Sequence, residues 1–180
     1  MRRRQFITLL GGAAAWPLAA RAQQGGRTRR IGVVINRDEN DPEGKALLSG
    51  FMQGLAELGW TDGRNARIDV RWGAGDVDRL RRLAKELVDL QPDVILAHTT
   101  PATAAVQRET RTIPIVFTLV SDPVGDGFVT GLPRPTGNIT GFINLEASMA
   151  GKWVELLTEA APRIQRAAIM FNPDTLTGAR

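Results

Sequence analysis

Short apolar runs that alternate with amphipathic segments constrain the fold of this chain more than any other feature. Residues 31–35 form a continuous apolar run, which is typical of a strand buried on both faces of a parallel sheet. Asp41 and Pro42 then favour the start of a helix, in which large apolar residues recur every three or four positions over 47–58. Gly59 is expected to end that helix. A strand and a helix thus form the first unit of the pattern.

The same pattern repeats along the chain. Further strands are expected at 68–72, 94–97, 113–118, 138–142 and 167–171, and further helices from Asp76, over 102–110 and over 147–161. Because the strand at 68–72 alternates apolar and charged residues, we expect it nearer the sheet edge. Strands that alternate with helices at this spacing predict an α/β fold with a doubly wound parallel sheet and right-handed crossovers. The sequence ends nine residues after the strand at 167–171. We therefore expect one lobe over 23–144, followed over 145–180 by a hinge helix and the first strand of an incomplete second lobe.

The first 22 residues have the pattern of a signal peptide. Three arginines at 2–4 precede an apolar run over 6–20, and Ala20 and Ala22 supply the small residues of a cleavage site. We therefore predict cleavage after Ala22 and a periplasmic mature protein. Residues 3–7 also resemble the twin-arginine motif, which implies export of a folded protein. Arg2 precedes the pair where Ser or Thr is usual, so export of an unfolded chain stays open.

Composition narrows the chemistry that the chain can perform. The 180 residues include no cysteine and one histidine, His98, which excludes thiol nucleophiles, cysteine-ligated metals and multi-histidine metal sites. No glycine-rich phosphate loop follows the first strand, and no cofactor is predicted. The leader holds four of the 23 basic residues and no acidic one, so the remaining 19 basic residues balance the 19 acidic ones. We therefore expect no binding to nucleic acid.

Polar residues follow three of the expected strands at their carboxyl ends. In an open parallel sheet, ligands bind at this edge near the topological switch point, where helix N-termini offer free N–H groups. The candidate ligand-binding residues are Asn36, Arg37, His98, Thr99, Thr100, Ser121 and Asp122.

Several of these residues have a structural alternative. A hydroxyl of Thr99 or Thr100 is expected to cap the following helix, with neighbouring N–H groups facing an anion. Asp122 before Pro123 suits a helix N-cap or a turn, or accepts a hydrogen bond from a ligand ammonium or hydroxyl. Arg37 is either solvated or pairs with a ligand carboxylate.

Four segments together resemble the substrate-binding proteins of ABC transporters. These segments are the leader, Gly63–Asn65 with Arg71 and Trp72, residues 112–118 leading to Asp122–Val124, and Gly137–Gly141. The resemblance covers essentially the whole chain and extends to the subgroup of tryptophan- and tyrosine-type uptake proteins. It implies a periplasmic-binding-protein fold of type I, with two α/β lobes, ligand between them, and members about twice this mature length. It also implies a hinge crossing near 141–144.

The resemblance places the ligand-holding loops of the first lobe on three pairs of residues. These are Asn36 with Arg37, Thr99 with Thr100, and Ser121 with Asp122. Family members often carry a small Ser or Gly where Asn36 and Arg37 stand. The chain is accordingly expected to be a non-enzymatic periplasmic component that captures a small amino-acid-like solute and docks on an inner-membrane permease.

Two other functions stay open. One is an exported α/β hydrolase that uses His98 and Asp122, although no Gly-x-Ser-x-Gly motif supplies a nucleophile. The other is a nonfunctional fragment of a solute-binding protein, because a single lobe buries only part of a ligand.

Overall fold

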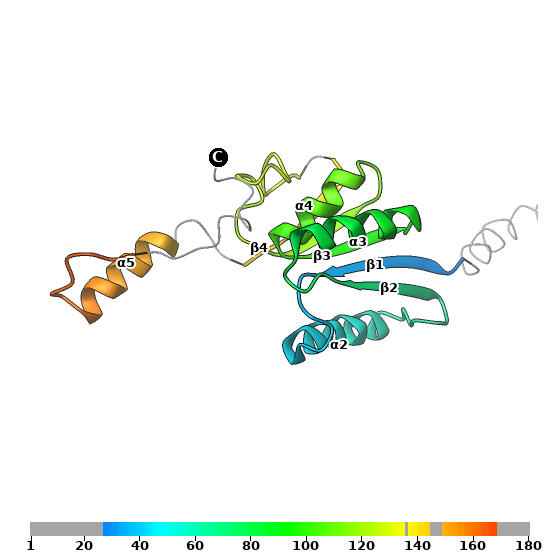
Figure 1. Ribbon diagram of the computed structural model, residues 1–180, viewed down its shortest axis with the longest axis horizontal. Helices are drawn as coiled ribbons and strands as arrows, with labels where there is room; N and C mark the ends of the chain where they lie inside the picture. The colour runs from blue at the N-terminus through cyan, green and yellow to red at the C-terminus, as the bar shows by residue number, and fades with distance from the viewer. Residues whose placement is uncertain (1–26, 136, 145–148, 169–180) are drawn as a thin grey trace, which may run out of the picture.

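The computed structural model describes residues 27–135, 137–144 and 149–168 (Figure 1). Strands and helices alternate in the order β1 (Arg29–Ile35), α2 (Pro42–Glu57), β2 (Ala66–Trp72), α3 (Val77–Asp89), β3 (Val94–His98), α4 (Thr100–Glu109), β4 (Ile115–Val120), β5 (Ile139–Ile143) and α5 (Met149–Ala160). The predicted signal peptide lies outside the described residues.

These strands form one sheet in the order β2-β1-β3-β4-β5, and each neighbouring pair is parallel. The predicted doubly wound α/β fold is therefore confirmed, and β2 lies at an edge as its alternating pattern indicated. After β1, the chain adds β2 on one side of β1 and then adds β3 on its other side. The topological switch point therefore lies between β1 and β3. Ligands bind at such a point in folds of this kind.

Helices cover the two faces of the sheet unequally. The α3 and α4 helices lie on one face, and α2 lies on the other (Figure 1). The larger core cluster is on the α3–α4 face and includes Val34, Leu80, Leu87, Ile95 and Phe117. On the opposite face, Ile31, Val33 and Ile35 of β1 pack with Leu48, Phe51 and Leu55 of α2. The α2 helix lies over β1 and β2, so part of the same face over β3 and β4 lines a hollow.

Aspartates begin the first two helices, as the sequence indicated. The Asp41 carboxylate accepts hydrogen bonds from the backbone N–H groups of Glu43 and Gly44, and Asp76 accepts one from Arg79. Each bond satisfies a donor that the first helical turn leaves free. These caps fix where α2 and α3 start, and therefore the length of the loops that precede them.

Several predicted bounds differ from the structure by one or two residues. The fourth strand starts at Ile115 rather than at 113, because the Thr110 hydroxyl accepts hydrogen bonds from the N–H groups of Thr112 and Ile113 and holds them in a turn. The predicted sixth strand lies mostly outside the described residues, and Ala167 and Ala168 are not in a strand.

The α5 helix extends away from the sheet (Figure 1). It exposes a group of large apolar side chains, namely Trp153, Val154, Leu156 and Leu157. The proposed division between a first lobe at 23–144 and a second at 145–180 stays a prediction. None of the described helices combines the length and hydropathy that a membrane span requires.

Candidate functional site

Hydrogen bonds join the loops that carry the predicted ligand-binding residues. The Thr99 N–H donates to the Thr118 carbonyl at 2.9 Å, which ties the loop after β3 to the end of β4. The Ser121 hydroxyl donates to the Asn144 side-chain oxygen at 3.2 Å, which ties the loop after β4 to the residue that follows β5. The structure therefore gathers these residues at one edge of the sheet, where its strands end.

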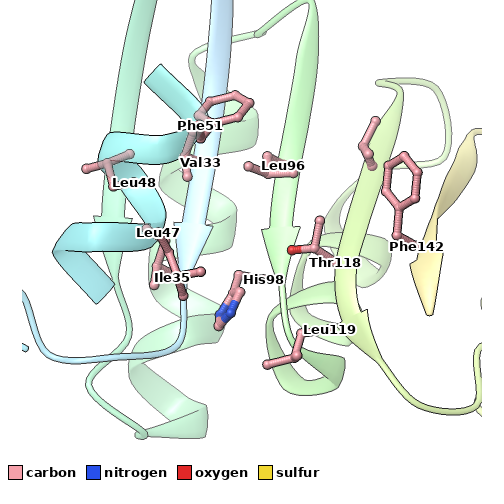
Figure 2. Close-up of a pocket in the computed structure, with 11 residues that line it drawn as sticks. Val33, Ile35, Leu47, Leu48, Phe51, Leu96, His98, Thr118, Leu119 and Phe142 are labelled. Carbon is pink, nitrogen blue, oxygen red and sulfur yellow. The ribbon is translucent and has the colours of Figure 1, made fainter. Parts of the chain in front are cut away.

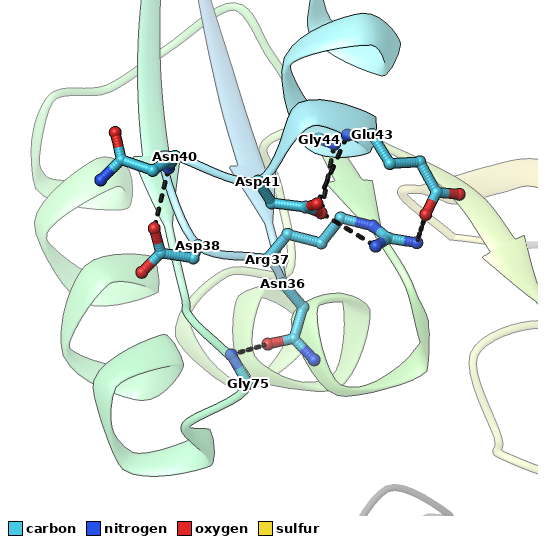
Figure 3. A network of polar contacts seen from close by, with 8 residues as sticks. All are labelled: Asn36, Arg37, Asp38, Asn40, Asp41, Glu43, Gly44 and Gly75. Carbon is cyan, nitrogen blue, oxygen red and sulfur yellow. Dashed lines mark hydrogen bonds and ion pairs between the residues drawn. The ribbon is translucent and has the colours of Figure 1, made fainter.

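The loop after β1 holds its two candidate residues in internal contacts (Figure 3). The Arg37 guanidinium forms ion pairs of 2.9 Å with both Asp41 and Glu43. Asn36 accepts a hydrogen bond from the Gly75 N–H at 3.1 Å. The expectation of a solvated Arg37 is wrong, because two carboxylates at the start of α2 bind its side chain. A ligand carboxylate would compete with both of them.

The Asp41 carboxylate both caps α2 and pairs with Arg37, so its replacement should lower the stability of the fold. The hydrogen bond from Arg37, helped by the Gly44 and Glu43 N–H groups, lowers the pKa of Asp41 below its usual 3.8. We expect Asp41→Ala to lower the Tm by several degrees, and Asp41→Asn to lower it less because asparagine also caps helices.

The pH dependence of Asp41 has a definite sign. Because its folded-state pKa is depressed, its stabilising contribution is complete above pH 3.8 and is lost as the pH falls through the folded value. Thermal melts from pH 7 to pH 3 check this. An Asp41→Asn curve that stays parallel to the wild-type curve down to pH 3 would contradict it.

The last residue of β3 and the residue after it carry two buried polar groups without partners. His98 is 8% exposed, and its Nδ1 atom has no hydrogen-bond partner. The Thr99 hydroxyl is also buried and unpartnered. The predicted hydroxyl cap of α4 is wrong for Thr99, because its φ of 86° differs from the negative φ values from which Asp41 and Asp76 reach their helices. The first turn of α4 therefore has no side-chain cap.

The loop after β4 uses its aspartate in a turn. Asp122 accepts a hydrogen bond from the Gly125 N–H at 2.8 Å, as expected of Asp before Pro. Of the two structural alternatives, the turn is correct and the helix N-cap is not. The other carboxylate oxygen is not used in this bond, so the residue keeps an acceptor at the sheet edge.

Two of the four non-glycine residues that have positive φ in the described part of the chain lie at the carboxyl ends of neighbouring strands. Thr99 after β3 has a φ of 86°, and Leu119 near the end of β4 has a φ of 57°. Positive φ is unfavourable for residues with a Cβ, above all for a β-branched one. Such conformations persist where surrounding structure enforces them, and they cluster at functional sites. Thr99 and Leu119 therefore lie at the same edge as the unpartnered polar groups.

A hollow of about 420 Å³ opens on the α2 face beside these residues (Figure 2). Its lining residues are Val33, Ile35, Leu47, Leu48, Phe51, Leu96, His98, Val116, Thr118, Leu119 and Phe142. His98 and Thr118 are the members with polar side-chain atoms. The sequence did not indicate Leu119 or Phe142 as site residues. For Phe142, the alternation that places every second residue of β5 on one face was the available signal.

Electrostatics keep the His98 imidazole neutral. Burial lowers the pKa of His98 below 6.5, and the positive charge of Arg37 lowers it further, while Glu43 acts in the opposite direction. A neutral imidazole offers one donor and one acceptor. Its Nδ1 has no carboxylate partner of the kind that orients the histidine of a hydrolase triad.

Metal-binding side chains do not cluster in the part of the chain that the structure describes. No group of three His, Cys, Asp or Glu side chains lies close enough there to hold an ion.

Comparisons with known proteins identify a family and several relatives. A family model described as "ABC transporter substrate binding protein" matches residues 33–177. A tyrosine-binding protein of Clostridioides difficile is 31% identical over 126 residues, which make up 68% of this chain and 35% of that protein. The fold is also similar to a conserved domain protein from Vibrio cholerae, with a TM-score of 0.74, 31% identity and coverage of 84% of this chain and 50% of the other.

A second solved structure has a bound ligand. It is an ABC domain from Streptococcus pneumonia in complex with L-Trp, with a TM-score of 0.66, 29% identity and coverage of 75% of this chain and 44% of the other. The chain thus spans half or less of the length of these relatives. The family match covers most of the chain and agrees with the α/β lobe and its polar edge. This chain belongs to the family of ABC transporter substrate-binding proteins.

Proposed function

We propose that this protein is a non-enzymatic, periplasmic solute-binding component of an ABC-type uptake transporter, and that its ligand is an amino acid. The observation that carries the proposal is a set of three buried polar atoms at the switch point. Arg37 Nε, His98 Nδ1 and Thr99 Oγ1 lack hydrogen-bond partners. Buried polar groups nearly always have a partner. A polar ligand in the crevice would supply the partners that the fold leaves out.

The chemistry of the edge suits a zwitterion. The uncapped first turn of α4 begins at Thr100, and such a terminus presents N–H donors and a partial positive charge to a carboxylate. The Ser121 hydroxyl and the Asp122 carboxylate follow β4, which is the strand next to β3, at the same edge of the sheet. An ionised carboxylate there suits an ammonium group. Asn36 and Arg37 would border the same crevice on the β1 side.

The relatives support an aromatic amino acid as ligand. One is named for tyrosine, and another was solved with L-Trp. The apolar hollow next to His98 has a volume within the range of small-molecule sites. We propose that the ligand's side chain faces this hollow while its amino and carboxylate groups face the polar loops.

The rest of the proposal concerns the whole protein. The leader pattern supports cleavage after Ala22 and export, and family membership supports delivery to an inner-membrane permease. The interlobe cleft and the hinge near 141–144 would follow if residues 145–180 begin a second lobe. Closure of two lobes on ligand is the motion that such an architecture allows.

Thermal melts of the full chain with the common amino acids test the proposal. A ligand at 100 times its Kd should add about 2.7 kcal/mol to the free energy of unfolding. We expect this increase with tyrosine or tryptophan and none with lysine or glutamate. Stability that no amino acid changes would contradict the proposal.

A threonine pair supplies the matched control. Thr99→Val removes the unpartnered hydroxyl and should weaken ligand binding by about tenfold, or about 1.4 kcal/mol. Thr112→Val makes the same change at an exposed position after α4, at the opposite edge of the sheet. It should leave the Kd unchanged. Equal Kd values for both variants and the wild type would show that the Thr99 hydroxyl does not contribute to ligand binding.

A further inference from the structure

We infer that His98 determines ligand specificity by hydrogen-bonding a hydroxyl or ring N–H at the edge of an otherwise apolar ligand side chain. The inference rests on the proposed function and goes beyond it. It states which of two similar ligands the protein prefers and which side chain makes the choice. The chemical class is a flat apolar side chain with one polar hydrogen, such as a phenol or an indole.

The register of the sheet places His98 at the mouth of the hollow. His98 is paired with Ile35 of β1 on one side and with Thr118 of β4 on the other. Its ring points from β3 toward the end of β1, near Ile35 (Figure 2). A side chain that enters from the carboxyl edge therefore meets the imidazole first. Further in, it meets apolar residues, such as Leu96 and Phe51.

The imidazole has an unused hydrogen-bonding position. His98 is more than nine-tenths buried, and its Nδ1 atom makes no hydrogen bond. In the tautomer that carries the proton on Nε2, Nδ1 is an acceptor, and a ligand hydroxyl or N–H that donates to it would satisfy it. A purely apolar ligand would cover it and leave it unpaired, which is unfavourable. The hollow therefore discriminates against a side chain that lacks the polar hydrogen.

The protonation state of His98 supports this role. The groups that act on it are Arg37, from the loop after β1, and Glu43, from the start of α2. Burial and Arg37 favour the neutral ring, and the neutral ring keeps an acceptor nitrogen. Protonation would convert that acceptor into a donor. Affinity for a donating ligand should therefore be constant at neutral pH and fall as the pH drops through the folded-state pKa, below 6.5.

Calorimetric titration of the full chain with L-tyrosine and L-phenylalanine tests the inference, because the two differ by one hydroxyl. We expect wild-type protein to bind tyrosine about tenfold more tightly than phenylalanine at pH 7.5. His98→Leu should bring the ratio of the two Kd values close to one. His98→Gln, which keeps a hydrogen-bonding side chain, should retain part of the preference.

The outcomes separate this inference from the proposed function. If both ligands bind with equal Kd values, or if His98→Leu keeps the tenfold ratio, the inference is wrong and the proposed function stands. If neither amino acid binds, both are wrong. If His98→Leu does not fold, His98→Gln decides. A ratio for His98→Gln equal to the wild-type ratio contradicts the inference.

Discussion

Gly141→Ala is expected to destabilise the lobe by about 3 kcal/mol. Gly141 lies in β5 and is paired with Phe117 of β4. A Cβ atom at this position would overlap the Phe117 carbonyl oxygen and lie 2.5 Å from Phe117 Cγ. Phe117 is 2% exposed and packs in the larger core cluster, so it cannot move aside. Either the β4–β5 pairing or the core must give way.

Urea unfolding of the two glycine variants Gly141→Ala and Gly54→Ala measures this effect. Gly54 lies within α2, and a Cβ there would meet nothing within 4 Å. Alanine at that position should raise the free energy of unfolding by about 0.5–1 kcal/mol, because alanine favours helix. A loss below about 1 kcal/mol for Gly141→Ala would show that β5 is not held tightly against β4.

Leu87→Ala is expected to lower the free energy of unfolding by about 2–5 kcal/mol. Leu87 of α3 is fully buried. It occupies the space that Gly32 of β1 leaves, because a Cβ on Gly32 would lie 2.7 Å from a Leu87 methyl carbon. Truncating the leucine opens a cavity in the larger cluster, and the close-packed surroundings can only partly collapse into it.

A double-mutant cycle tests whether these two residues fit together as described. Gly32→Ala alone should destabilise through the clash, and Leu87→Ala should relieve that clash. The double variant should therefore be more stable than the sum of the single changes predicts. Leu58→Ala is the control, because Leu58 is 77% exposed and should change stability by less than about 0.5 kcal/mol. Strict additivity of Gly32→Ala and Leu87→Ala would contradict the packing argument.

Local chemistry made much of the fold predictable. Asp41 and Asp76 cap helices through short-range hydrogen bonds, which depend on residues three or fewer positions away. The alternation in β2 predicted its edge position, because one face of an edge strand packs less fully. The parallel direction of the strands follows from similar reasoning, since strands joined by helices run parallel. The order of the strands was not predicted, and β2 and β3, which α3 joins, are not neighbours.

Features that depend on distant residues were not predictable. Thr99 suits an N-cap by residue type, yet the bond from its N–H to Thr118 belongs to a conformation with positive φ. Nothing around Leu119 in the sequence indicates positive φ either. The hollow exists because α2 covers only part of one face of the sheet. The position of α2 depends on how its side chains pack on several strands, which the local sequence does not determine. Arg37 is an exception, because its ion-pair partners Asp41 and Glu43 are only four and six positions away, and the path of the loop between β1 and α2 brings them to its guanidinium.

The unequal covering of the sheet has a consequence for how the lobe opens. The cluster under α3 and α4 contains most of the fully buried side chains, whereas α2 rests on a smaller one. Amide hydrogens in β3 and α3 should therefore exchange with solvent only through global unfolding. Those in α2 should exchange through a separate opening of lower free energy. Because α2 forms one wall beside His98, ligand bound there should slow exchange in α2 while leaving exchange in α3 nearly unchanged.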